Sequence, residues 1–213
     1  MLQVQGFTFN DFRENTYVLF NESRQCWIVD PGMYRADETE ELAAFISGRE
    51  LVPQAIINTH THIDHILGVQ ALKDRYGIPF LVHQLDLPVL EAAAATALMF
   101  GIRLPAAPAA DGFIREGAPL MLGADRLEVR FTPGHSPGSV VFYYPSGKWV
   151  IGGDVLFYQS IGRTDLPGGD HRTLLESIRR EMLTLPGDTQ VLPGHGPATT
   201  IDFEKANNPF LTT

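Results

Sequence analysis

Apolar residues recur along the first third of the chain with the two spacings that distinguish strands from helices. Short runs of β-branched and aromatic residues, bounded by turn residues such as Asp30-Pro31-Gly32, indicate strands. Leu42, Phe45 and Ile46 are spaced to share one face of a helix. The pattern predicts strands over residues 16–20, 26–29, 54–58 and 79–82, and helices over 38–47 and 66–76.

The second half repeats this arrangement. It predicts strands over residues 127–131, 140–144, 149–151 and 189–192, and an amphipathic helix over 173–185. Between the halves, residues 92–97 read as helical, and the Pro/Ala-rich residues 104–112 as a loop that covers a pocket or simply connects two elements. Two β-rich halves punctuated by helices predict two packed sheets with helices outside.

Composition and charge exclude several classes of protein. The 213 residues are 44% hydrophobic and 19% charged, with a net charge of −9. An acidic chain lacks the basic surface that nucleic acids and anionic membranes attract. A single cysteine, Cys26, excludes an internal disulfide framework and fits a reducing compartment. We therefore expect one domain, residues 1–213, located in the cytoplasm, with no membrane or nucleic-acid partner; the oligomeric state stays open.

The stretch Thr59 to His65 carries the chemistry. Four potential metal ligands, His60, His62, Asp64 and His65, fall within six residues directly after a predicted strand. His60 and His62 point the same way in an extended segment, because side chains there alternate with a period of two. They can therefore reach one metal ion together. Asp64 and His65 stand where the next helix begins and can turn toward a second ion, although Asp64 is also suited to cap that helix.

Three further ligand candidates each follow a predicted strand and sit in a glycine-marked turn. They are His135 in TPGHS, Asp154 in IGGD and His195 in LPGHG. Glycine beside a ligand lets the backbone turn sharply and approach the ion. Histidines mixed with carboxylates suit divalent metals. We expect two divalent ions, with zinc first and iron or manganese also compatible.

These seven residues, in their order and spacing, resemble the ligand set of the metallo-β-lactamase superfamily. The resemblance covers nearly the whole chain and implies an α/β fold, an αββα sandwich of two mixed sheets with the metals at one edge. It implies that His60, His62 and His135 hold the first metal. It further implies that Asp64, His65 and His195 hold the second and that Asp154 bridges the two, which makes Asp64 and Asp154 the catalytic carboxylates.

Within that superfamily the chain is most similar to the short glyoxalase II-like hydrolases. The matching stretches are Gly162–Asp170, Pro193–Pro197 and Asn208–Leu211. In contrast to the longer glyoxalase II enzymes, we expect no counterpart of their C-terminal helical domain, which supplies glutathione contacts. Arg163 falls where those enzymes carry a glutathione-binding lysine, and Asp165 stands where they have a tyrosine.

The resemblance implies a hydrolase that cleaves a small-thiol thioester, such as S-lactoylglutathione, through a metal-bridging hydroxide. Arg163 would offer a cation to a substrate carboxylate, or else form a structural ion pair. A persulfide dioxygenase, with one iron held by His60 or His62, His135 and Asp154, is an alternative, and so is a lactonase or another carbonyl hydrolase of the superfamily. The Pro-Gly-His-Gly-Pro stretch around His195 favours the hydrolase.

Other polar residues receive structural interpretations. His83, at the end of a predicted strand, is expected to be a packed or capping residue. His171 stands at a predicted helix start, where a structural role is favoured over substrate contact. Cys26 lies in an apolar strand and is expected to be buried and inert. Asn15 precedes the first strand and is expected to form a turn.

Overall fold

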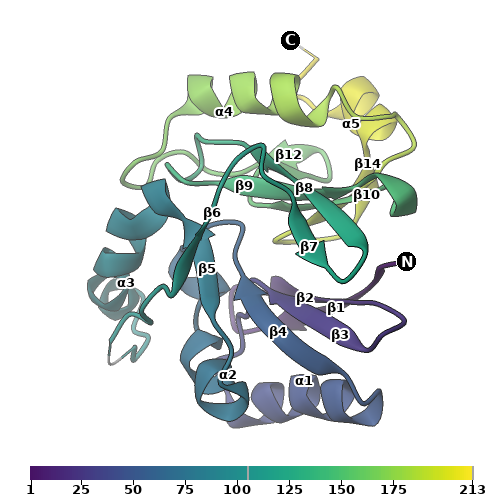
Figure 1. The fold of residues 1–213 in the computed structure, drawn as a ribbon. Coiled ribbons are helices and arrows are strands. Elements are labelled where there is room, and N and C mark those ends of the chain that lie inside the picture. Colours follow the sequence, from purple (N-terminus) through teal and green to yellow (C-terminus); the bar gives the residue numbers. More distant parts are fainter. Residues whose placement is uncertain (105, 213) are drawn as a thin grey trace.

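Two six-stranded β-sheets lie face to face in the computed structural model, which describes residues 1–104 and 106–212, and helices cover their outer faces (Figure 1). This αββα arrangement is the fold that the sequence predicted. Pro105, part of the predicted loop 104–112, lies outside the described residues. The rest of that stretch, up to residue 111, contains no helix or strand, as expected.

The first sheet has the strand order β1-β2-β3-β4-β5-β6. Its first three strands pair antiparallel, and the pairs from β3 to β6 are parallel. The strands are β1 (Gln3–Phe9), β2 (Glu14–Phe20), β3 (Gln25–Val29), β4 (Val52–Ile57), β5 (Phe80–His83) and β6 (Gly112–Ile114).

The second sheet has the order β14-β13-β10-β9-β8-β7, and in it only β10 and β13 pair in parallel among the described residues. Its strands are β7 (Leu120–Leu122), β8 (Asp125–Phe131), β9 (Val140–Tyr144), β10 (Trp149–Gly153), β13 (Gln190–Pro193) and β14 (Thr199–Thr200). A separate hairpin is formed by β11 (Leu156–Phe157) and β12 (Ser160–Ile161).

Helices flank both sheets. On the outer side of the first sheet lie α1 (Ala36–Gly48) and α2 (Val69–Tyr76), and α3 (Leu87–Met99) stands beside β5 and β6 (Figure 1). On the outer side of the second sheet lie α4 (His171–Ser177), which continues as a π-helical segment (Ile178–Met182), and α5 (Ile201–Asn207). No helix in the described part of the chain is long and apolar enough to cross a bilayer.

The two-residue period of the strands explains the layers. In β2, Val18 and Phe20 pack toward the helices, whereas Tyr17 and Leu19 pack between the sheets. Strand β9 divides its side chains in the same way between the space between the sheets and the layer under α4. Successive side chains of a strand point to opposite faces, so a strand that is buried on both faces must be apolar throughout.

One helix begins later than the sequence predicted. Residues Ile63–His65 form a 3₁₀ turn, and α2 starts at Val69 rather than near Ile66, with Gly68 as its N-cap residue. The prediction that Asp64 could cap this helix is therefore wrong. Its carboxylate is free to face the other ligand candidates.

Candidate metal centre

All seven predicted ligands converge at the end of the two sheets where their strands run into loops. The loop after β4 carries His60 and His62, and the 3₁₀ turn that follows carries Asp64 and His65. The second sheet contributes the other three residues from the loops after β8, β10 and β13, namely His135, Asp154 and His195. The loops of the two sheets therefore face one another across a single site.

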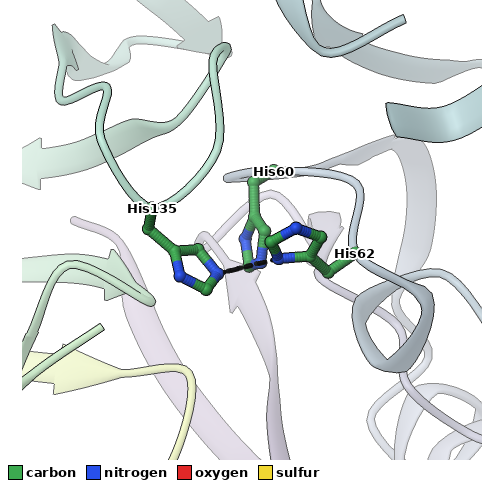
Figure 2. Close-up of side chains that lie close together, drawn as sticks. All are labelled: His60, His62 and His135. Carbon is green, nitrogen blue, oxygen red and sulfur yellow. Dashed lines mark hydrogen bonds between the residues drawn. The ribbon is translucent and has the colours of Figure 1, made fainter. Parts of the chain in front are cut away.

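Three of the histidines form a tight group of ring nitrogens (Figure 2). His135 Nε2 lies 2.8 Å from His62 Nδ1 and 3.2 Å from His60 Nε2. His60 and His135 are each 2% exposed. Three nitrogens this close, in a buried setting, form the donor set that a divalent ion such as zinc or iron prefers.

A second group lies next to the first. His195 Nε2 is 3.1 Å from Asp64 Oδ2, and His65 Nε2 is 3.7 Å from the same oxygen. The Asp154 carboxylate stands between the groups. Its Oδ1 is 3.4 Å from His65 Nε2, and its Oδ2 is 3.5 Å from both His135 Nε2 and His195 Nε2. This is the position of a residue that could touch an ion in each group.

The outward-facing ring nitrogens of three ligand histidines are engaged by the protein. His135 Nδ1 lies 2.8 Å from the backbone oxygen of Arg163, and His195 Nδ1 lies 3.0 Å from that of Phe12. His65 Nδ1 lies 3.2 Å from Asp30 Oδ2. Oxygen acceptors at these positions require a proton on the outer nitrogen, which leaves the inner nitrogen of a neutral ring with a lone pair directed at the site.

Two buried atoms in this centre have no hydrogen-bond partner among the described residues: His65 Nε2 and Asp154 Oδ1. An unpaired polar atom in a buried setting costs free energy, and native proteins rarely leave one without a partner. A cation between the inward lone pairs and the carboxylates would satisfy both atoms. The residues present therefore fit a pair of divalent ions.

Burial and neighbouring charges divide the histidines into two kinds. Burial and the nearby His135 lower the pKa of His62 to about 4, and burial with the nearby His65 lowers the pKa of His60. Burial acts in the same direction on His65, but Asp64 and Asp154 outweigh it and raise its pKa. His60 and His62 are therefore neutral at pH 7, whereas the second group pairs imidazoles with carboxylates.

Known proteins with similar sequences support this fold and this arrangement of ligands. Residues 10–195 match the family model described as the metallo-beta-lactamase superfamily. The chain belongs to this superfamily. It is 43% identical over 199 residues to the probable metallo-hydrolase YqgX of Bacillus subtilis, covering 92% of each chain. It is 34% identical over 219 residues to the hydroxyacylglutathione hydrolase GloC of Haemophilus influenzae, covering 100% of this chain and 99% of that one.

Solved structures from the superfamily superpose closely. The B3 metallo-beta-lactamase BLEG-1 is 41% identical, with a TM-score of 0.91 over 99% of this chain and 100% of that one. The protein TTHA1623, solved in a di-iron-bound form, is 40% identical, with a TM-score of 0.87 over 97% of this chain and 100% of that one. Together with the relatives above, these similarities establish a metal-dependent hydrolase of the superfamily.

Two glycines, Gly153 and Gly194, allow the loops that carry the ligands to approach one another closely. A Cβ atom added to Gly194 would lie 2.2 Å from Asp154 Oδ1 and 2.7 Å from His65 Cε1. Gly153 has a φ of +47° and would place a Cβ 2.4 Å from Thr59 Oγ1. The prediction that glycine permits a close approach beside the ligands is confirmed at these two positions.

Two residues that hold the ligand loops were missed or misread in the sequence. Asp86 is fully buried and accepts hydrogen bonds from both the loop of His60 and the loop of His135. Asn15 was expected to form a turn, and this is wrong. Asn15 lies in β2, and its Nδ2 donates to the backbone oxygens of Pro193 and Gly196, at 3.0 and 2.9 Å. It therefore holds the turn that carries His195.

A cavity of about 350 Å³ opens onto the ligands. Its walls are largely apolar, and they also include Arg163. The guanidinium group of Arg163 forms two hydrogen bonds of 2.7 Å to the carboxylate of Asp165, which lower the pKa of Asp165 to about 2. Arg163 thus forms the ion pair that was one of its two expected roles, and substrate binding remains a prediction.

The remaining histidines and the cysteine lie away from the ligands. His83 accepts a hydrogen bond from Leu85 N at the start of a 3₁₀ turn, and its Nε2 lies 3.0 Å from Glu116 Oε2. These contacts agree with the structural role expected of it. His171 is the exposed first residue of α4. Cys26 is fully buried, and burial raises the pKa of its thiol to about 12, which agrees with an inert residue.

Proposed function

We propose that this protein hydrolyses thioesters of small thiols, with S-lactoylglutathione as the first candidate substrate. One observation carries the proposal: Asp154 lies between a three-histidine group and an Asp–His–His group at the end of a largely apolar cavity. The similarity to GloC over the full chain supports the thioester in particular. We further propose that residues 1–213 act as one domain, since both sheets supply the residues of this centre.

Each residue of the centre has a proposed role. His60, His62 and His135 would hold the first divalent ion, Asp64, His65 and His195 the second, and Asp154 both. We take zinc first, with iron and manganese as alternatives. When bound, two such ions supply a water of lowered pKa and an electrophile for a carbonyl oxygen. The centre then needs no separate general base.

The surrounding residues would orient the reaction. Asp64 lies at the cavity wall, and its free carboxylate oxygen is placed to accept a hydrogen bond from an attacking water. A thiolate leaves readily, so the site needs no strong general acid for the departing group. Arg163 would face a substrate carboxylate only by sharing its guanidinium group with Asp165.

A second candidate is hydrolysis of a β-lactam amide, which the similarity to BLEG-1 favours. Both reactions attack a carbonyl carbon with water and use the same ions. They differ in the leaving group, since an amide nitrogen must be protonated as it departs, whereas a thiolate need not be. No arrangement of ligands alone selects between the two carbonyls.

The test is the initial rate of S-D-lactoylglutathione hydrolysis by metal-loaded protein, beside a chelator-treated sample and a β-lactam substrate. We expect chelator-sensitive thioester turnover that is lost in Asp154→Ala. The matched control is Asp188→Ala, which removes a surface carboxylate paired with Lys148. Turnover of the β-lactam without turnover of the thioester would replace the proposal with the second candidate. Turnover that survives the chelator would overturn both.

A further inference from the structure

A second cavity, of about 230 Å³, opens beside the metal centre between α3 and residues 166–168. It shares His62, Thr96 and Leu166 with the cavity that contains the ligands, so the two spaces adjoin. None of its nine lining residues is an acid, a lysine or an arginine. We call this second space the α3 groove.

Small side chains on α3 form one wall of the groove. Val89, Ala92 and Thr96 lie three and four residues apart, so they share one face of the helix. On another face, Leu90, Ala93 and Ala97 are buried in the core and fix the helix in place. The space therefore exists because residues 92 and 96 are small, and not because the helix is loosely packed.

The opposite wall is rigid. It contains Pro137, Pro167 and Gly168. Gly168 has a φ of +86° and approaches Pro137 so closely that an added Cβ would lie 2.5 Å from Pro137 Cγ. Proline restricts the backbone of this wall on both sides of the contact. A groove with fixed apolar walls is ready to take up an apolar group without first being ordered.

We propose that the α3 groove binds the aliphatic acyl chain of the substrate while the carbonyl group of that chain lies at the metal centre. The inference rests on the proposed function and extends its substrate class from the lactoyl thioester to acyl thioesters with an unbranched alkyl chain. The groove begins at His62, where a carbonyl at the ions would direct its acyl substituent. The thiol part of a cellular thioester carries polar or charged groups, which an uncharged apolar groove would exclude.

Binding of the carboxylate product tests the groove without requiring turnover. Isothermal titration calorimetry of metal-loaded protein with acetate, butyrate, hexanoate and octanoate gives the dissociation constant at each length. Burial of one methylene contributes about 0.8 kcal/mol, so we expect binding to tighten about fourfold per methylene until the groove is full. Dissociation constants that do not change with chain length would overturn the proposal.

Two phenylalanine substitutions on α3 test whether the dependence on chain length arises in the groove. Ala92→Phe fills the groove and should remove the dependence on chain length, with Ala92→Leu intermediate. Ala95→Phe adds the same ring at an exposed alanine that does not line the groove, and should keep the wild-type dependence. Metal content is measured for each variant, so that a lost ion is not mistaken for a filled groove. A dependence that persists in Ala92→Phe would contradict the proposal.

Hydrolysis of acyl thioesters of a single thiol, N-acetylcysteamine, gives the second readout. We expect the ratio of kcat/KM for the hexanoyl and acetyl esters to be high in the wild type and in Ala95→Phe, and close to one in Ala92→Phe. A wild-type ratio near one would overturn the proposal that the α3 groove binds the acyl chain, but it would leave the proposed thioesterase activity standing. If no thioester is hydrolysed but carboxylate binding depends on chain length, the proposed function fails and the groove still binds alkyl chains.

Discussion

The carboxylate of Asp86 accepts hydrogen bonds from both the backbone N–H and the hydroxyl group of Thr61, at 2.5 and 2.8 Å. Thr61 stands between His60 and His62. The other oxygen of Asp86 accepts from Gly138 N at 2.8 Å and from the hydroxyl group of Ser136. One buried carboxylate therefore joins the two loops that supply the three-histidine group.

Asp86→Asn should loosen both loops. The asparagine amide keeps one acceptor oxygen and turns an NH₂ group toward donors that lose their partner. A buried donor left unsatisfied costs about 1–3 kcal/mol, so we expect the free energy of unfolding to fall by about 3 kcal/mol. Urea denaturation of metal-free protein measures this loss. Asp188→Asn, at an exposed ion pair, is the control and should unfold like the wild type. Equal stability of the two variants would show that Asp86 does not hold the loops.

Asn15→Ala should weaken the second metal selectively. The substitution removes the two side-chain hydrogen bonds to the His195 turn, but it leaves the 2.7 Å bond from Asn15 N to Gly194 O. Loss of a residue that orients a ligand typically lowers metal affinity at least about tenfold. Competition with a chromophoric chelator measures each site separately. Asn207→Ala, which removes one exposed bond within α5, should change neither affinity. An equal loss of affinity at both metal sites would contradict the role of Asn15 in holding the turn of His195.

Gly194→Ala should separate Asp154 from His65. The added methyl group would overlap the Asp154 carboxylate, and backbone neighbours leave little room for it to move. We expect loss of bound metal and of activity, with the fold retained by circular dichroism. Gly48→Ala, where a Cβ meets nothing within 4 Å, is the matched control and should keep both metals. An active Gly194→Ala enzyme would mean that Asp154 need not occupy its present position.

Lowering the pH should empty the two sites in sequence. Protons compete with a metal for ring nitrogens, so a histidine with a higher pKa gives up its metal at a higher pH than one with a lower pKa. Burial and His135 lower the pKa of His62 to about 4, and burial with His65 lowers the pKa of His60, so these two rings stay available to a metal at a lower pH than an ordinary imidazole does. At His195, burial lowers the pKa, but the hydrogen bond to Asp64 and the charge of Asp154 together outweigh it and raise the pKa, so its site protonates nearer neutrality. Cobalt absorption spectra recorded between pH 7 and pH 4 should show the Asp64–His65–His195 site lost first. Loss of the three-histidine site first would contradict this division of the ligands between the two sites.

Much of the fold could be predicted because its strands are buried on both faces. Runs such as 140–144 are continuously apolar and leave little ambiguity. Strand β1 was missed because it is an edge strand with mostly exposed or half-exposed residues, which gives only a weak alternation. Strands β11, β12 and β14 have two residues each, too few to show any period. The late start of α2 follows from the 3₁₀ turn at 63–65, which shares the composition of a helix start.

In the site, residues in local sequence patterns could be predicted, whereas residues defined by distant contacts could not. The ligand candidates could be found because His-x-His-x-Asp-His and the three glycine-marked turns are local patterns. The residues that hold them could not be found, because their partners lie far away in the chain. Asn15 donates to a residue 178 positions away, and Asp86 accepts from Thr61 across 25. The groove beside α3 could not be predicted either, since its lining comes from four separate segments.

The number of metal ions bound per chain decides whether the seven residues build a two-metal centre. Native mass spectrometry of metal-free protein titrated with zinc should show saturation at two ions for the wild type. The double variant Asp64→Ala/His195→Ala should saturate at one ion, held by the three histidines. A wild-type protein that saturates at one ion, or a double variant that still binds two, would contradict a two-metal centre built by these seven residues.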